Sequence, residues 1–508
     1  MRVLPTVLLL TTLLGGAGPS ANLLDDPHLP VVARTPEEAA RIAAVTAPPE
    51  KFGAPEDFEG MPGGAATVRA RTTADAFSLS SANMPFEREM DFKLGNGLFR
   101  KTWVGAPAST RASDGLGPLY NARACQDCHL KDGRGHPPVG PDDSRVSMFL
   151  RLSIPGGDKD GRPEIRDYLA TRPEPSYGGQ LQDLALPGHA AEGRMTVTYA
   201  EEAVTLADGT IVHLRRPTYA VEAPAYGSLH PDTMLSPRVA PQMIGLGLLG
   251  AVPAGDILAL ADRDDADGDG ISGRPNIVWS LEHQRPMLGR FGHKAGAPTV
   301  REQSAGAFSG DMGLSNPLFP DHFGDCSAAE PACRAAPSGQ EDDVRDGLEV
   351  DGQSLDLVAF YSSNLAVPAR RDLNDAQVLR GKAVFHELGC AGCHHPKFVT
   401  HRLDGQPEQS FQLIWPMTDL LLHDMGDGLA DHRPEARATG TEWRTAPLWG
   451  LGMTQTVSGH TQLLHDGRAR SIIEAILWHG GEAQASRDGV VGLPADDREA
   501  LLRYLESL

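Results

Sequence analysis

Two short motifs of the form Cys-x-x-Cys-His constrain this 508-residue chain more than any other feature. They occupy residues 125–129 (CQDCH) and 390–394 (CAGCH). Two thiols at this spacing can bond to the two vinyl groups of one haem, and the adjoining histidine then lies beneath the iron. A disulfide or a chance match is the alternative for one copy, but it explains two copies poorly. We therefore predict two covalently bound haem c groups. Their thiol ligands are Cys125, Cys128, Cys390 and Cys393, and their proximal iron ligands are His129 and His394.

The N-terminus has the pattern of a secretory signal peptide. Arg2 precedes an apolar run at 3–14, and small residues follow as far as Ala21. This run is shorter than the roughly 20 apolar residues that a spanning helix needs, and no later segment reaches that length. We therefore predict a signal peptide at 1–21, export to the periplasm and no membrane span. The formal net charge of −21 argues against nucleic acid as a partner, because phosphate binding requires an excess of Lys and Arg.

The remaining chain is predicted to form an arm and two haem domains. Residues 22–85 form an extended N-terminal arm with one helix at about 36–47. Residues 86–365 form a first cytochrome c-like haem domain, and residues 366–508 form a second. The helical segment before each motif contains a phenylalanine, Phe99 or Phe385, as in the first helix of a small c-type cytochrome. The expected fold class is mainly α.

The stretch from about 140 to 240 differs from this helical pattern. Residues on either side of Asp208-Gly209 alternate between apolar and polar, which predicts a β-hairpin with a tight turn. We therefore expect a β-containing insertion in the first haem domain. In the second domain, Asn374 or Asp375 should cap a helix to about 388. Asp496 or Asp497 should cap a final helix to 508.

The chain resembles the bacterial di-haem cytochrome c peroxidases, and is most similar to their di-haem oxidoreductase branch, the thiol oxidoreductase-like c-type cytochromes. The segments that carry the resemblance are 115–138, 241–253, 419–433 and 442–483. The resemblance implies two haems in electronic contact, one storing electrons and one cleaving hydrogen peroxide. It also implies a small redox protein as electron donor, of the cytochrome c or cupredoxin type.

The same resemblance implies a peroxide-cleaving site. The matching residues are Phe291, Glu302-Gln303 and Asp311-Met312-Gly313. Gln303 would steady the peroxide and Asp311 would move the proton. Relatives carry Glu where this chain has Asp311, and a proline where it has Ala307. The alternative is that Gln303 and Asp311 are solvated loop residues.

His293 lies near the position of an inter-haem tryptophan in relatives. Three roles are open for it: a residue between the haems, an iron ligand and a structural residue.

The sixth ligand of the second haem iron is expected to be Met425. Met453 and His460 are further candidates, and core packing is the alternative for Met425. His465, in the family's His-Asp-Gly turn, is expected to line the second haem pocket without binding iron.

Two smaller features complete the predicted sites. Cys326 and Cys333 are expected to form a short disulfide in an exported protein. Asp265, Asp267 and Asp269 begin like a calcium loop, although its twelfth position is Asn276 instead of Glu. A Ca²⁺ site and a solvated acidic turn both remain open.

These features predict a periplasmic di-haem peroxidase that reduces hydrogen peroxide. Two alternatives stay open. One is a non-catalytic electron-transfer cytochrome, including one that serves iron acquisition. The other is a di-haem oxidase or oxygenase that acts on a protein or organic substrate.

Overall fold

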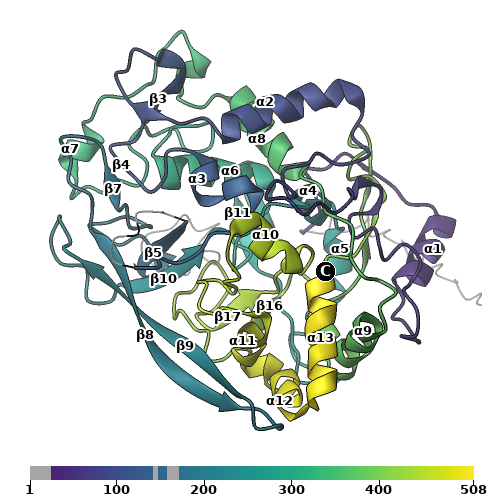
Figure 1. The fold of residues 1–508 in the computed structure, drawn as a ribbon. Helices are drawn as coiled ribbons and strands as arrows, with labels where there is room; N and C mark the ends of the chain where they lie inside the picture. The colour runs from purple at the N-terminus through teal and green to yellow at the C-terminus, as the bar shows by residue number, and fades with distance from the viewer. Residues whose placement is uncertain (1–23, 141–142, 144–146, 157–170) are drawn as a thin grey trace, which may run out of the picture.

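The computed structural model describes residues 24–508 except 141–142, 144–146 and 157–170 (Figure 1). The predicted signal peptide therefore lies outside the described residues. Within the described ranges, no helix combines the length and the apolar character needed to cross a membrane.

The prediction of a mainly α fold is wrong. The chain is 29% helix and 19% strand, with many small sheets, and is a mixed α/β structure. The 56 glycines and 40 prolines interrupt the chain so often that the longest described helices, α6 and α13, have 13 residues each. The long connecting loops are joined to one another by pairs of two- or three-residue strands. The helical pattern of the sequence does not predict these strands.

The helices beside the first motif form one packed group at the top of Figure 1. They are α2 (Glu89–Phe99), α3 (Cys125–Cys128), α6 (Val300–Met312) and α8 (Gly352–Ser363). Helices α2 and α8 approach closely at Gly95, where a Cβ atom would lie 2.1 Å from the carbonyl oxygen of Leu357. This approach places Phe99, at the end of α2, next to the His129 ring, with the ring centroids 6.2 Å apart.

The helices beside the second motif repeat this arrangement. They are α9 (Ala376–Glu387), α11 (Ile472–Leu477), α12 (Gln484–Gly492) and α13 (Ala495–Ser507), whereas α10 (Thr454–Ser458) contacts the segment that directly follows the first motif. A Cβ atom on Gly381 of α9 would lie 1.9 Å from the carbonyl oxygen of Ala500 in α13. Phe385 in α9 lies next to the His394 ring, with centroids 6.3 Å apart.

The two predicted caps in this region had different outcomes. Asp375 is the N-cap of α9, as predicted. The prediction for the last helix was off by two or three residues, because α13 has Pro494 as its N-cap. Asp496 and Asp497 instead occupy its first turn, where acidic side chains also favour the helix dipole.

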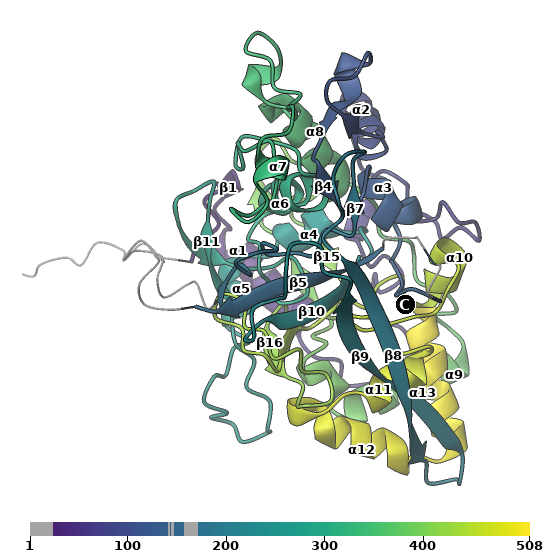
Figure 2. The same ribbon diagram turned by 90° about the vertical axis from the view of Figure 1, so that its left-hand side faces the viewer.

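The predicted β-hairpin is confirmed. Strands β8 (Arg194–Thr205) and β9 (Ile211–Glu222) pair in antiparallel register over their full 12-residue lengths. The hairpin runs past α11 to the end of α12 (Figure 2). The backbone N–H of Ala207 donates to Val491 O at 2.9 Å, and the Tyr219 hydroxyl donates to Asp466 at 3.0 Å. The hairpin is thus hydrogen-bonded to the region of the chain that follows the second motif.

A three-stranded sheet lies at the base of this hairpin, in the order β10-β5-β6. Its strands are β10 (Met234–Val239), β5 (Met148–Pro155) and β6 (Thr171–Arg172). Apart from the N-terminal arm and the strand that pairs with it, the remaining α-helices and strands are short. They are the helices α4 (Leu246–Gly250), α5 (Ala254–Leu258) and α7 (Pro331–Arg334), and the strands β2 (Val104–Gly105), β3 (Asp114–Leu116), β4 (Leu119–Tyr120), β7 (Leu184–Ala185), β11 (Ile277–Ser280), β12 (Arg285–Leu288), β13 (Phe398–Val399), β15 (Leu413–Ile414), β16 (Leu422–Asp424) and β17 (Glu442–Arg444).

The N-terminal arm is fixed to distant parts of the chain. Its predicted helix is confirmed as α1 (Pro36–Thr46), capped by Thr35. Strand β1 (Val31–Val32) pairs with β14 (Arg402–Leu403). Asp26 forms an ion pair with Arg290 and a hydrogen bond with the His401 ring, and its carboxylate also accepts the Ala254 backbone N–H. The arm therefore contributes a buried charge to the core.

Replacing Asp26 with Ala should lower the free energy of unfolding by about 3 kcal/mol. Arg290 is only 1% exposed, and breaking a buried ion pair leaves the remaining charge without its counter-ion. Chemical denaturation of the haem-loaded protein measures the loss. The matched control is Asp25→Ala, which removes a half-exposed ion pair with Arg285 and should cost under about 1 kcal/mol. Equal losses in the two variants would contradict this assignment.

Candidate di-haem site

One cavity of roughly 680 Å³ is lined by both motifs. Cys125, Cys128 and His129 contribute from α3 and its C-cap. Cys390, Cys393 and His394 contribute from the turn that follows α9. The fold therefore brings the two motifs to a common internal space, which is large enough for a sizeable organic ligand.

The two motif histidines have the same hydrogen-bond arrangement. His129 Nδ1 lies 2.8 Å from Pro241 O, and His394 Nδ1 lies 2.9 Å from Met417 O. Each ring can donate only through Nδ1–H to its carbonyl, which leaves the lone pair of Nε2 available for a metal. Burial lowers the pKa of both rings to about 4, so each is in the neutral form that binds iron.

The motif cysteines are suited to covalent attachment and poorly suited to thiolate chemistry. None of the four is in a disulfide. Burial raises the pKa of the Cys125 and Cys390 thiols to about 12, which disfavours the reactive thiolate of a redox dithiol. The last two cysteines, Cys326 and Cys333, are joined in a disulfide away from the cavity.

Basic side chains complete the lining of the cavity. They are Arg134, Arg151, Arg238, Arg290, Arg433, Arg444 and Arg487. Guanidinium groups bind carboxylates through paired N–H donors, and each haem carries two propionate carboxylates. The Nε atoms of Arg433 and Arg487 are buried and have no hydrogen-bond partner among the described residues. The thiols, the histidines and these unpaired donors together fit two haems.

Gln303 and Asp311 both line this cavity, and they lie on helix α6 instead of in the solvated loop of the alternative reading. Helix α6 begins after the N-cap Thr299 and ends at Gly313, whose φ of 66° terminates the helix. Eight positions separate Gln303 from Asp311, which is about 12 Å along a helix axis. The two side chains therefore serve different points of the cavity.

Their surroundings differ too. Asp311 Oδ1 accepts a hydrogen bond from Gln180 Nε2 at 2.9 Å, and burial raises the pKa of its carboxyl group. Glu302, next to Gln303, accepts from the Leu281 backbone N–H at 2.9 Å and from the Ser280 hydroxyl. Glu302 is therefore tied to the strand end at Ser280, whereas Asp311 is held by a single side-chain amide.

The candidates for the sixth ligand of the second iron separate clearly. Met425 lines the cavity, as its predicted role requires. Met453 is instead buried in an apolar core cluster, and His460 Nε2 is engaged with Arg134 O at 3.0 Å; neither lines the cavity. His479, which the sequence analysis missed, does line it. Its Nδ1 lies 2.7 Å from Ala475 O, so its Nε2 is available like that of His394.

A buried aromatic group lies in the same cavity wall. Trp443 stacks on His465 with ring centroids 3.7 Å apart, and His293 meets the Trp443 ring edge-on at 6.5 Å. His293 Nε2 is engaged with Val239 O at 2.8 Å, which ties the ring to the end of β10 and supports a structural role. Sequence reasoning singled out His293 and His465 but missed Trp443 between them.

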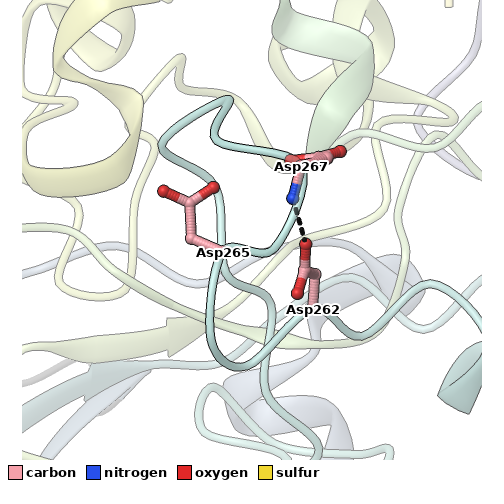
Figure 3. A group of neighbouring side chains, drawn as sticks. All are labelled: Asp262, Asp265 and Asp267. Atoms are coloured by element: carbon pink, nitrogen blue, oxygen red, sulfur yellow. Dashed lines mark hydrogen bonds between the residues drawn. The ribbon is translucent and has the colours of Figure 1, made fainter.

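The acidic loop brings together a different set of carboxylates from the predicted one. Asp262, Asp265 and Asp267 offer oxygen atoms within 4.8 Å of one another, and Asp269 is outside this group (Figure 3). Asp262 also accepts from the backbone N–H of Asp267 at 3.3 Å, and Asp265 accepts from that of Gly270 at 3.1 Å. The carboxylates therefore fold the loop as well as forming a group that could hold a cation.

Comparison with known proteins agrees with the two-haem geometry. A family model described as "Di-haem oxidoreductase, putative peroxidase" matches residues 58–508. No curated protein matches the chain. Among solved structures, a hydrazine synthase from Kuenenia stuttgartiensis, pressurised with xenon, matches at 16% identity. That match covers 40% of this chain and 70% of the other, with a TM-score of 0.22, which is too low to carry an argument. The family match spans most of the sequence and both motifs, and the chain belongs to the di-haem oxidoreductase family.

Proposed function

We propose that this protein is a periplasmic c-type cytochrome with two covalently bound haems that reduces hydrogen peroxide to water. Its electrons would come from a small redox protein of the cytochrome c or cupredoxin type. The observation that carries the proposal is the shared cavity, in which both motif histidines have a free Nε2 and Asp311 is the acid on the wall near the first motif. The family description supports the coarser statement of a di-haem oxidoreductase.

The chain's own residues account for proton movement in this reaction. One peroxide, two electrons and two protons give two waters, and the haems supply the iron centres and the stored electrons. Asp311 takes the proton from the inner peroxide oxygen and returns it to the outer one, which leaves as water. Gln303, in the first turn of α6, orients water or peroxide entering the cavity. Arg433 and Arg487, whose Nε donors are unpaired among the described residues, would hold carboxylate groups of the cofactor.

The pH dependence follows from the state of Asp311. The carboxylate must be ionised to accept a proton, and burial raises its pKa above the ordinary value of 3.8. Turnover should therefore be constant above that raised pKa and fall as the pH drops through it. A steady-state pH profile of kcat/KM for peroxide measures this acid limb. A limb at or below the pKa of an ordinary aspartate would contradict the assignment of Asp311 as the base.

Visible and EPR spectra test the proposed function as a whole. They are recorded on the oxidised and half-reduced protein, before and after peroxide is added. We expect high-spin haem in at least one state and a spectral change with peroxide. Two low-spin haems in both states and no response would show an electron-transfer cytochrome instead. Peroxide consumption that oxidises an added organic or protein substrate, but not a reduced donor, would show an oxidase or oxygenase.

A calcium ion at the acidic loop is a separate part of the proposal. Oxygen-only ligands suit Ca²⁺, and exposed extracellular sites bind it with dissociation constants of about 10⁻⁴–10⁻³ M. Calorimetric titration with CaCl₂ should show such binding, and Asp265→Ala should weaken it at least about tenfold. Asp264→Ala, in the same loop but outside the carboxylate group, is the control. An absence of binding heat in the unmodified protein would identify the loop as a solvated turn.

A further inference from the structure

The carboxylate of Asp311 is held by a residue from a distant part of the chain. Gln180 lies 131 positions earlier, between β6 and β7, and is completely buried. Its Nε2 donates to Asp311 Oδ1 at 2.9 Å and to Asn121 Oδ1 at 2.5 Å. This bond is the one side-chain hydrogen bond that Asp311 receives within the described residues.

The orientation of the Gln180 amide follows from its neighbours. Its nitrogen faces oxygen acceptors on Asn121, Gly310 and Asp311, and its own Oε1 has no partner among the residues that the structure describes. A flipped amide would direct an oxygen at these acceptors. Only the arrangement with the NH₂ group towards Asp311 is consistent with these contacts.

The backbone of Gln180 is fixed as firmly as its side chain. Its N–H donates to Asp325 Oδ2 at 3.0 Å, and the residue forms a β-bridge with Arg151 in β5. Asn121, four positions before the first motif, donates its backbone N–H to Asp311 O at 2.8 Å. Three segments therefore meet at the Gln180 amide: the β-containing insertion, the residues just before the first motif, and the end of α6. These contacts fix the position of the amide relative to the Asp311 carboxylate.

We propose that Gln180 is a positioning residue that orients the Asp311 carboxylate and keeps it in the ionised form for proton transfer. This inference rests on the proposed function. The N–H donor occupies Oδ1 and leaves Oδ2 for the cavity that Asp311 lines. A donor to a buried carboxylate favours its charged form, whereas burial alone favours the neutral form. The other charged group that acts on Asp311 is the Arg151 guanidinium, because Cys125 and Cys128 carry uncharged thioethers once haem is attached.

Two substitutions test this role. Gln180→Leu removes the donor, and Gln180→Glu keeps the shape but places a second acid against Asp311. Both should move the acid limb of the kcat/KM profile for peroxide upward, Gln180→Leu by about one to two pH units and Gln180→Glu by more. The infrared carbonyl band of protonated Asp311, assigned by its loss in Asp311→Asn, should titrate with the same upward shift. This second readout does not depend on turnover.

Gln182 provides a matched control in the same segment. It is also buried, and its Nε2 donates to Gly310 O at 2.8 Å on the same end of α6, but it makes no hydrogen bond to Asp311. Gln182→Leu should lower the thermal stability as Gln180→Leu does, and leave both titrations unchanged. Unshifted titrations in both Gln180 variants, or an equal shift in Gln182→Leu, would overturn the inference. A shifted infrared band together with normal peroxide turnover in Asp311→Asn would uphold Gln180 as a positioning residue and refute the catalytic role of Asp311.

Discussion

Asp311→Asn should lower kcat/KM for hydrogen peroxide by a factor of about 10²–10⁴, the usual contribution of a positioned general base. The amide keeps the size of the side chain but cannot take up the peroxide proton. The residue lies on α6 and belongs to neither haem-attaching motif, so both haems should be retained. Haem content from the reduced pyridine spectrum, measured beside the turnover rate, separates lost chemistry from lost cofactor.

The control for this substitution is Asp183→Asn. Asp183 is another acid whose pKa is raised by burial, to about 6, and it accepts a hydrogen bond from Asn121 at 2.9 Å. It does not line the cavity, and an Asn oxygen can accept the same bond. Turnover should change less than about threefold in this control. Normal turnover in Asp311→Asn would remove Asp311 from the mechanism.

The parts of this protein that could be predicted from sequence are those specified by neighbouring residues. The thiol and imidazole groups of each motif lie within five consecutive positions, so their chemistry can be predicted without knowing the fold. The same holds for the Thr35 and Asp375 caps and for the turn at Asp208-Gly209. Each is a local interaction that the side chain makes with nearby backbone.

The mixed fold could not be predicted in this way. Strand β1 pairs Val31 with Leu403, and β16 pairs His423 with Trp443. Strands of two or three residues carry almost no periodic signal, and their partners are chosen by tertiary packing. The resemblance to small cytochromes therefore predicted the helices around each motif, but it did not predict the small sheets that join the loops between those helices.

The site shows the same division. Gln303 and Asp311 could be named from the sequence, but their helix was missed although Thr299 and Gly313 are ordinary start and stop signals. Gln180 and His479 carried no motif that links them to a haem site. Their roles depend on Asp311 and on the cavity, and both arise only when distant segments meet.

His479→Ala should convert the second haem from low-spin to high-spin, whereas Met425→Ala should leave it low-spin. His479 Nδ1 is anchored to Ala475 O, the arrangement that His129 and His394 also show, and the residue lines the shared cavity. A ligand fixed in this way loses little freedom when it binds iron, whereas the flexible Met425 thioether has no such anchor. EPR of the oxidised protein measures the spin state of each haem.

Redox potentiometry gives a second, independent measure of the same ligand. Bis-histidine ligation holds a haem at a lower potential than His/Met ligation, and axial ligands together span about 0.8 V. His479→Met should therefore raise the potential of the second haem by more than about 0.1 V while keeping it low-spin. Met425→Leu, which keeps the volume of the side chain, is the control and should leave the potential nearly unchanged. If Met425→Ala, and not His479→Ala, produced the high-spin signal, Met425 would be the ligand and the electron-storing haem would be the high-potential His/Met type.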